Sequence, residues 1–372
     1  MKKIICFLVA ILALASCGDK SPQDLFDESK SGVVMILNEY YYTLTLPDGN
    51  VIYFTGVDSD GTLKDITFDQ KDILTKRQAM TGTGFFIDNQ GTIMTNRHVA
   101  QPQIDKAAVK NSYNQLVSSI KAYYSAQMSE MSEAYQELEN QKNGCYYTDY
   151  YGEICADEQK LQQIASRQSE LAEQFNTLNN VRESLNDNLS LDELKIASVC
   201  EIGIAYNNTF VTSEKDFNGK NPCVVTKVSG EENVDLALLQ LKDKRTPGEA
   251  HIFAVDGSVD EGFVDRLKEK FSSKDERILQ IDQQLYMIGY NAGPTLANTR
   301  KGVQVQMTSG KVTQMPDGER VLYSIPTVQG SSGSPVVNAR GQLVAVNFAK
   351  LIGSDNFNFG IPLNKIQAFV GR

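Results

Sequence analysis

Three segments carry side chains that could do chemistry together, and they follow one another in the order His, Asp, Ser. His98 ends the run TNRH, Asp235 opens the run DLALLQL, and Ser332 lies within GSSGSPVVN. A serine hydroxyl becomes a good nucleophile only when a base removes its proton, and an imidazole suits that task because its pKa lies near neutrality. A carboxylate orients the imidazole and stabilises its charged form. The three side chains are therefore candidates for nucleophilic attack on a carbonyl group.

The sequence around these residues resembles a known family. TGTGFFI at 81–87, MIGYNAGP at 287–294 and TSGKV at 308–312, together with the three segments, are similar to the trypsin-fold serine proteases of the HtrA-like (Deg-type) group. The similarity covers roughly residues 25–102 and 196–372. The resemblance implies an all-β, trypsin-like double β-barrel, in which two perpendicular six-stranded barrels hold the catalytic residues in the cleft between them.

The resemblance also implies a role for each candidate residue. His98 would be the general base, Asp235 its orienting carboxylate and Ser332 the nucleophile. The backbone N–H groups of Gly330 and Ser332 would form the oxyanion hole, which stabilises the transition state. The implied activity is that of a serine-type endopeptidase working through an acyl-enzyme intermediate, with no cofactor and no metal. His251 lies in no motif, so we expect it at the surface or in packing.

Three positions depart from the family pattern. Ser331 stands where the trypsin branch has an aspartate that pairs with a newly cut N-terminus, so activation by such a cut is not expected. Ser334 replaces the usual glycine after the nucleophile; its small side chain is expected to fit, but the geometry of the oxyanion hole is left open. Pro326 stands where trypsins place an acid, so we expect small or medium apolar residues at P1 rather than Arg or Lys. No PDZ-type domain is expected after Ser332.

A long helical insertion is expected between His98 and Asp235. Residues 103–221 contain no proline. Two stretches within them have apolar residues at a spacing of three and four, which is typical of amphipathic helices. These residues are Val117, Ile120, Tyr124, Met131, Tyr135 and Leu138 in the first stretch, and Leu161, Ile164, Leu171, Phe175, Leu178 and Leu185 in the second. We therefore expect an inserted antiparallel coiled-coil hairpin over residues 103–195.

The expected turn of this hairpin is rich in tyrosine. It reads CYYTDYYGEIC at 145–155, and tyrosine offers a large contact area at a low entropy cost. The loop could dock a protein partner or a second protomer, or its rings could cap the helix ends, and the sequence leaves both open. Residues 105–195 hold eight Lys or Arg and fifteen Asp or Glu, a net charge of −7, which we interpret as the solvated face of a coiled coil.

The first residues have the features of an export signal. A positive start, MKK, precedes the apolar run 4–15, which is shorter than the ~20 residues that a membrane helix needs. The run LASC at 14–17 resembles a bacterial lipobox, in which Cys17 becomes the lipid-modified first residue of the mature chain; a plain secretory signal is the alternative. We therefore expect a lipoprotein of the cell envelope, on the periplasmic or outer-membrane face, that touches the membrane through its lipid anchor only.

The cysteines fit the same expectation. Of the six in the chain, Cys6 would leave with the signal and Cys17 would be acylated. Those that remain are Cys145, Cys155, Cys200 and Cys223. Exported proteins meet oxidising conditions, in which disulfides persist. Four cysteines allow three connectivities, and proximity in the sequence favours Cys145–Cys155 and Cys200–Cys223.

The composition narrows the classes of function. The net charge of −10, from 46 acidic and 36 basic residues, argues against a nucleic-acid binder, which needs clustered Lys and Arg. Only two histidines are present and no CxxC pair, so a His/Cys zinc site is not expected. A GxxxxGK[ST] loop for a nucleotide is also missing from the sequence.

The expected organisation places a signal peptide at 1–16, a lipidated tether at 17–24, a protease domain at 25–102 and 196–372, and the hairpin at 103–195. The leading interpretation is a lipid-anchored serine endopeptidase that cleaves exported proteins or peptides. A narrower one is a regulatory protease that cuts one protein brought by the arm. The alternative from a different class is a catalytically latent protease-fold scaffold that binds a partner through the coiled-coil arm.

Overall fold

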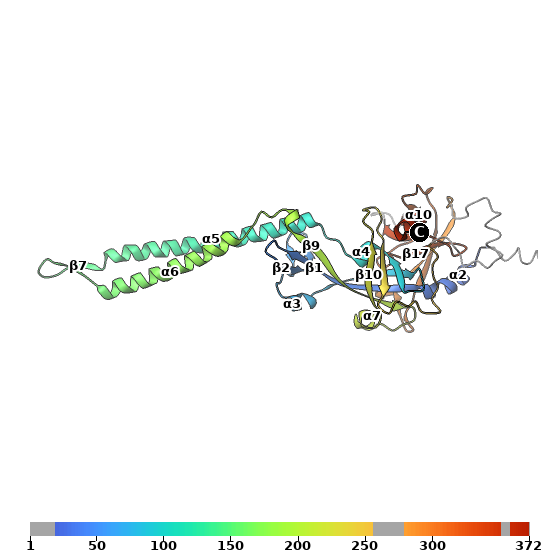
Figure 1. The fold of residues 1–372 in the computed structure, drawn as a ribbon, viewed down its shortest axis with the longest axis horizontal. Helices are drawn as coiled ribbons and strands as arrows, with labels where there is room; N and C mark the ends of the chain where they lie inside the picture. Colours follow the sequence, from blue (N-terminus) through green and yellow to red (C-terminus); the bar gives the residue numbers. More distant parts are fainter. Residues whose placement is uncertain (1–18, 256–278, 351–357, 372) are drawn as a thin grey trace, which may run out of the picture. The chain divides into compact units, whose positions relative to one another are not determined.

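A computed structural model describes residues 19–255, 279–350 and 358–371 (Figure 1). The expected signal peptide and the lipidation site Cys17 lie outside the described residues. Within these ranges, no helix is both long enough and apolar enough to cross a membrane. The chain divides into two compact units. The first comprises Met1–Tyr40, Arg77–Gln103 and Ser198–Arg372, and the second comprises Tyr41–Lys76 and Ile104–Ala197.

The first unit is built on a closed β-barrel. Its strands, in order across the sheet, are β1 (Val33–Thr45), β5 (Gln78–Phe86), β6 (Thr92–Thr95), β11 (Ala237–Leu241), β10 (Pro222–Val228) and β9 (Lys195–Tyr206). A further pairing of β1 with β9 closes the barrel. Val34 and Ile36 of β1 are two residues apart, so both face the same side, where they pack with Phe86 and Leu239. This barrel confirms one half of the expected fold.

The second sheet of the first unit also has six strands. In order, they are β15 (Gln306–Lys311), β12 (Gln284–Gly289), β17 (Pro335–Asn338), β18 (Leu343–Lys350), β19 (Asn358–Pro362) and β16 (Val321–Tyr323). This sheet is a curled half-barrel, not the closed barrel that was expected. Among the described residues, only an isolated bridge between Val312 and Tyr323 joins its two edges. The three residues of β16 form their ladder with β19 on the other side.

A shared apolar core fixes the two sheets of the first unit to each other. Met35 and Phe85 from the barrel and Ile288, Val337 and Ile366 from the second sheet and its terminal helix belong to one cluster of buried side chains. Short elements complete this unit. They are α2 (Pro22–Ser29), η1 (Lys30–Gly32), α4 (Arg97–Ala100), α7 (Lys215–Asn218), α9 (Pro294–Ala297), β13 (Asn298–Thr299), β14 (Gly302–Val303) and α10 (Leu363–Val370).

The second unit combines small strands with two long helices. Its elements are β2 (Val51–Phe54), β3 (Gly56–Val57), β4 (Leu63–Lys64), α3 (Gln70–Leu74), α5 (Lys106–Asn143), β7 (Tyr146–Thr148), β8 (Ile154–Ala156), α6 (Glu158–Ser184) and η2 (Leu191–Glu193). Residues 41–76 therefore group with the helices, although the sequence analysis placed them in the protease domain.

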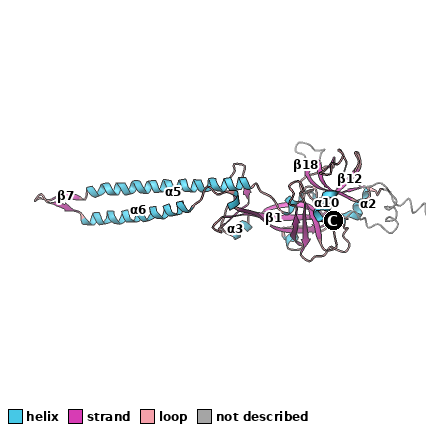
Figure 2. Cartoon of the chain, turned by 45° about the horizontal axis from the view of Figure 1, so that its top comes forward, coloured by secondary structure: helices cyan, strands magenta, loops and turns pink. Residues whose placement is uncertain are grey.

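Helices α5 and α6 lie side by side and run in opposite directions (Figures 1 and 2). The carboxylate of Asp105 accepts hydrogen bonds from the backbone of Ala107 and Ala108, which caps the first turn of α5. Asp157 caps α6 in the same way, and the small β7–β8 hairpin joins the two helices. The two expected long helices are thus present, while their packing as a coiled coil stays a prediction.

The structure corrects the cysteine pairing, because all four described cysteines are free. In the β9–β10 ladder, Cys223 lies opposite Ile202, not opposite Cys200. In the β7–β8 ladder, Cys155 lies opposite Tyr147, again two positions from its expected partner. Such diagonal neighbours are about 7–8 Å apart, whereas a disulfide spans about 4.4–6.8 Å between Cα atoms. Proximity in the sequence could not show this offset.

Candidate active site

His98 and Asp235 are brought together by the pairing of β6 with β11. His98 lies in α4 directly after β6, and Asp235 lies two residues before β11, whose Ala237 is opposite Thr95. His98 Nδ1 is 2.5 Å from Asp235 Oδ2, and the His98 backbone N–H donates to Oδ1 at 3.0 Å. Because a carboxylate only accepts hydrogen bonds, Nδ1 of the neutral ring carries the proton and Nε2 keeps a free lone pair.

Asn96 and Arg97 hold the segment that carries Asp235. Asn96 Nδ2 donates to the Asp235 carbonyl oxygen at 2.8 Å. The Arg97 guanidinium donates to three backbone carbonyl oxygens within residues 229–232, at 3.0–3.2 Å. The Asp235 side chain is 17% exposed, while that of His98 is 38% exposed and open to an incoming molecule. The sequence analysis missed both residues, although their place beside His98 was a usable signal.

Ser332 lies in a tight loop that the barrel holds through Thr83. Gly330 has φ +96° and Gly333 has φ +86°, a left-handed backbone that favours glycine. Thr83, on β5, donates its N–H to the Ser332 carbonyl oxygen and its hydroxyl to that of Gly330, both at 2.8 Å. Its hydroxyl also accepts from the N–H of Tyr290 at 3.0 Å. One barrel residue thus fixes the loop and the end of β12.

Close packing places this loop beside the helix that carries His98. A Cβ added to Gly82 would lie 2.6 Å from Cγ1 of Val99, the residue after His98, and 3.3 Å from the Ser332 carbonyl oxygen. The structure therefore brings His98, Asp235 and the loop that carries Ser332 into one region of the first unit. The Ser332 hydroxyl is half-buried and makes no hydrogen bond to any residue that the structure describes.

Two backbone N–H groups of the Ser332 loop have no acceptor among the described residues. The N–H groups of Ser331, Gly333 and Ser334 donate to carbonyl oxygens at 2.9–3.1 Å, but those of Gly330 and Ser332 donate to none. Gly330 is buried, and buried N–H groups without a partner are rare in proteins. These two groups are therefore available to an oxygen atom of a bound molecule.

A buried asparagine, Asn347 on β18, fastens the same loop. Its Nδ2 donates to the Ser331 carbonyl oxygen at 3.0 Å, and its Oδ1 accepts from the Tyr323 hydroxyl at 2.8 Å. Burial raises the pKa of Tyr323 well above its usual value, so this hydroxyl remains a donor. The sequence analysis missed Asn347; the signal was a polar residue inside the apolar run LVAVNFA.

The two serines that depart from the family pattern are both buried, but the Ser334 hydroxyl has no hydrogen-bond partner among the described residues. Ser331 is 2% exposed, and its hydroxyl donates to the Val328 carbonyl oxygen at 2.7 Å. This local hydrogen bond occupies the position at which the trypsin branch has an aspartate paired with the N-terminus. Ser334 is fully buried, and a Cβ added to Gly289 would lie 2.0 Å from its Oγ. Gly289 therefore provides the space that the Ser334 side chain occupies.

Other candidate groups lie outside this arrangement. The ring of His251 packs edge-on against Phe253, with centroids 4.6 Å apart, and burial lowers its pKa. Of the two places expected for it, at the surface or in packing, this is the second. In the part of the chain that the structure describes, no group of three or more His, Cys, Asp or Glu side chains is placed to hold a metal ion.

Two comparisons with known proteins found a match, one to a family model and one to a solved structure. Residues 203–346 match the family model of the trypsin-like peptidase domain, a stretch that includes Asp235 and Ser332. One matching solved structure is the serine endoprotease from Yersinia pestis, with a TM-score of 0.41 and 12% identity. That alignment takes in 95% of this chain and 66% of the other, so this chain spans just under two thirds of its length. No curated protein matches. Residues 203–346 are thus similar to a trypsin-like peptidase domain, and the described part of the first unit is mainly β structure.

Proposed function

We propose that the protein is a serine endopeptidase in which Ser332 is the nucleophile, His98 the general base and Asp235 the orienting carboxylate. The match to a trypsin-like peptidase domain supports serine-type peptidase chemistry. The 2.5 Å contact between His98 and Asp235 supports the role of the base, because it fixes the tautomer that leaves Nε2 free to accept a proton.

In the proposed reaction, His98 Nε2 takes the proton of the Ser332 hydroxyl as its oxygen bonds to the scissile carbonyl carbon. The carbonyl oxygen becomes an oxyanion and accepts hydrogen bonds from the N–H groups of Gly330 and Ser332. The intermediate then collapses, the C–N bond breaks and His98 returns the proton to the leaving amine. Water attacks the acyl-enzyme by the same path and regenerates the hydroxyl.

The pair of unpaired N–H groups is the observation that carries this proposal. Within residues 330–334, the three other N–H groups are all hydrogen-bonded, and only those of Gly330 and Ser332 have no acceptor in the part of the chain that the structure describes. A scaffold that had lost catalysis would have no reason to keep the buried N–H of Gly330 without a partner, since a buried unpaired group costs about 1–3 kcal/mol.

The proposed substrates are exported proteins or peptides with a small or medium apolar residue at P1. Pro326 carries no charge, and the next residue, Thr327, donates its hydroxyl to the buried Asn358 at 2.6 Å. Neither neighbour supplies a carboxylate for Arg or Lys. Cleavage of a peptide library should therefore occur after residues such as Ala or Val, and efficient cleavage after Arg would refute this preference.

Covalent labelling by a fluorophosphonate probe tests the nucleophile. The wild-type chain should be labelled, whereas Ser332→Ala and His98→Ala should not. Ser334→Ala is the matched control, because it removes a buried hydroxyl two residues away and should keep the label. Ser332→Ala should also lower kcat by about 10⁶-fold, as removal of a triad serine does. A folded wild-type chain without label would overturn the proposal.

We also propose that the chain is exported and anchored through a lipid on Cys17, as its lipobox-like LASC run suggests. Cells fed a labelled fatty acid should incorporate it into the wild-type protein and not into Cys17→Ala. A wild-type protein that carries no label would contradict the anchor.

A second candidate function, a scaffold that binds a partner through the hairpin, has one specific observation in its favour. Tyr150 is 96% exposed and Tyr151 is 87% exposed in the β7–β8 loop. The rings therefore do not cap the helix ends, and they offer aromatic surface to a partner. Replacing both by serine should abolish cross-linking to that partner in the cell envelope while labelling at Ser332 persists. Unchanged cross-linking would remove this candidate.

A further inference from the structure

Asn38 is a polar residue on the inner side of the closed barrel. It lies two positions after Ile36 on β1, so its side chain points to the side where Ile36 packs in the barrel core. Its side chain is fully buried. Its Nδ2 donates to the carbonyl oxygen of Val99 at 2.8 Å and to that of Ala100 at 3.2 Å. Asn38 thus links strand β1 to helix α4, which carries the proposed general base.

Helix α4 is too short to fix its own position. It spans four residues, Arg97–Ala100, and its turn is closed by hydrogen bonds from Ala100 to Asn96 at 3.2 Å and from Gln101 to Arg97 at 2.7 Å. A single helical turn is unstable by itself, because ordering its backbone costs more free energy than so few hydrogen bonds contribute. The position of α4 therefore depends on contacts with the rest of the first unit.

The two ends of α4 are held by different elements. At its start, the backbone N–H groups of Arg97 and His98 donate to the carbonyl oxygen and the carboxylate of Asp235, at 3.2 and 3.0 Å. The last carbonyl groups of a helix have no partner within it, and in α4 these are the two that Asn38 holds. A helix held at one end only can pivot about that end, so the second hold limits how far the His98 ring can turn.

The other atom of the Asn38 amide argues that stability alone does not explain this residue. Its Oδ1 is buried and has no hydrogen-bond partner among the described residues. Such an unpaired group costs about 1–3 kcal/mol. Val99 and Ala100 belong to the apolar cluster of the barrel, where a leucine would bury no unpaired oxygen. What the amide adds in this place is the N–H group that it directs at the end of α4.

We propose that Asn38 is a positioning residue for His98, which acts by holding the far end of α4 so that the imidazole keeps its orientation on Asp235. This inference rests on the proposed function of His98 as the general base. A base must lie within hydrogen-bond reach of the proton that it takes, and a small misplacement of a reacting group can lower a rate by about 10²-fold. Asn38 suits this task because β1 is itself fixed by its ladder with β5, in which Asn38 lies opposite Met80.

Nuclear magnetic resonance of the histidine rings tests this role without relying on catalysis. The chain contains only two histidines, so the untagged full chain with isotope-labelled histidine gives signals from two imidazoles. In the wild-type chain, His98 should show one tautomer, with its proton on Nδ1. Asn38→Leu should shift the His98 signals and speed the exchange of that proton with water. The signals of His251, which packs against Phe253, should not change. Unchanged His98 signals in the folded variant would overturn the proposal.

The rate of fluorophosphonate labelling at Ser332 and the hydrolysis of a peptide give the kinetic readout. Asn38→Leu should lower the labelling rate and kcat by about 10²-fold. KM should remain nearly unchanged, because a fully buried side chain does not contact the substrate. Asn38→Gln keeps the N–H donor and should recover part of the lost kcat. Asn338→Leu is the matched control, since Asn338 is also a buried amide, and its side chain bonds to Gln342 and the backbone of Arg340.

The control and the two readouts separate the possible outcomes. Asn338→Leu should lower the melting temperature without changing the His98 signals or kcat. Equal losses of kcat in Asn38→Leu and Asn338→Leu would show that Asn38 acts only through stability and would overturn the proposal. If Asn38→Leu does not fold, Asn38→Ala takes its place in both measurements. A wild-type chain that is not labelled would contradict the proposed function, and the histidine signals would still decide whether Asn38 positions His98.

Discussion

The Ser332 loop and the helical hairpin are held in place by different kinds of contact. The hydrogen bond from Thr83 to Gly330 joins residues 247 positions apart, and Asn347 adds a second long-range hold on the loop. In the hairpin, α6 buries only three of its residues, Ile164, Gln168 and Leu171. A destabilising substitution near the Ser332 loop should therefore affect distant parts of the first unit, whereas one in the hairpin should affect only its neighbours. The chain can keep a precise site on one unit while the other tolerates change.

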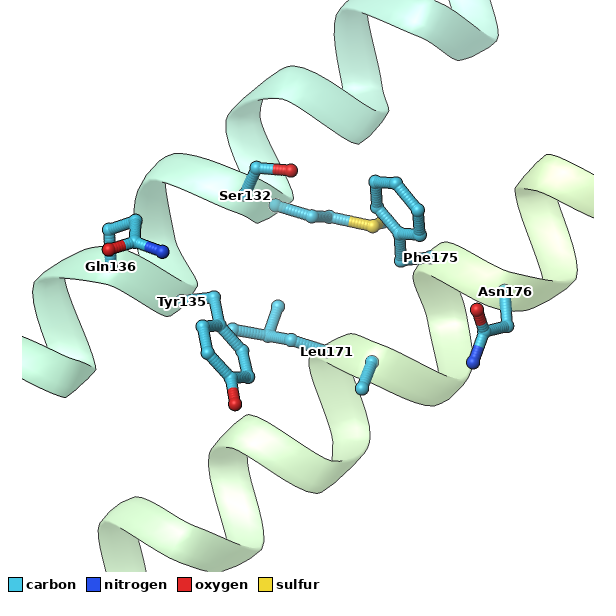
Figure 3. A pocket seen from close by; sticks show the side chains of 8 residues that line it. Ser132, Tyr135, Gln136, Leu171, Phe175 and Asn176 are labelled. Atoms are coloured by element: carbon cyan, nitrogen blue, oxygen red, sulfur yellow. The ribbon is translucent and has the colours of Figure 1, made fainter.

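The sharpest test of this contrast replaces one leucine in each region by alanine and compares the losses of stability and activity. Leu285→Ala, at a fully buried position of β12, should cost about 3–5 kcal/mol of unfolding free energy and most of the peptidase activity. Leu171→Ala should cost only about 2 kcal/mol, because the pocket that Leu171 lines between α5 and α6 admits water, and activity should remain (Figure 3). Amide hydrogen exchange would show which part of the chain loses stability in each variant. Loss of activity in Leu171→Ala would break the contrast.

The next largest effect is expected at Asn347. Asn347→Ala frees the Ser331 carbonyl oxygen and removes one partner of the Tyr323 hydroxyl, so we expect a loss of about 100-fold in kcat/KM, or about 2.7 kcal/mol. The loss should fall mainly on kcat, since the proposed oxyanion hole would act in the transition state.

Asn338→Ala is the control for this variant. Asn338 is also buried, and its side chain bonds to Gln342 and to the backbone of Arg340 in the turn after β17. It should lower the melting temperature to a similar extent with kcat nearly unchanged. Equal losses of kcat in the two variants would show that Asn347 acts only through stability.

Gly289 and Ser334 give a smaller effect that can be reversed. Gly289→Ala places a methyl group 2.0 Å from Ser334 Oγ and should cost about 1–3 kcal/mol. Ser334→Gly in the same chain removes the clash, so the double variant should recover most of the lost stability. A double-mutant cycle in denaturant measures this coupling. Additive losses would mean that the two residues do not share one space.

The smallest effect concerns His251. Burial lowers the pKa of its ring in the folded state below the ordinary 6.5, so the unfolded chain binds a proton more readily. Its contribution to stability is therefore complete above that value and is lost as the pH falls below it. His251→Gln should reduce the drop in melting temperature between about pH 7.5 and 5.5. An unchanged drop would assign the acid sensitivity to other groups.

The sequence alone predicted the parts of this site that sit in recognisable local runs. His98, Asp235 and Ser332 each lie in such a run, and the apolar spacing of three and four indicated both long helices. Thr83, Arg97 and Asn347 were missed, because their roles depend on carbonyl oxygens far away in the sequence. The backbone carbonyl oxygen of any residue type can accept a hydrogen bond, so the sequence does not show which residue is the acceptor.

Strand register was the other limit. The expected pairs Cys145–Cys155 and Cys200–Cys223 are close in the sequence, but each is offset by two positions in its ladder. The alternation of apolar and polar residues shows which face a residue occupies and does not show its partner. The sequence also did not show that the second sheet is open at one edge, because the alternation of residues does not show which strands pair with β16.

The hairpin also affects how the barrel can fold. His98 and Asp235, at the ends of paired strands, are 137 positions apart, and the hairpin occupies most of that interval. The base of the hairpin is tied by hydrogen bonds from Asn114 to Leu189 and from Lys121 to Asp187. Helices with local contacts form before strands that are distant in sequence. Once the hairpin has formed, its two ends are held together, which shortens the loop that must close when β6 pairs with β11. The insertion therefore adds chain length without a proportionate increase in the entropy cost of closing that loop.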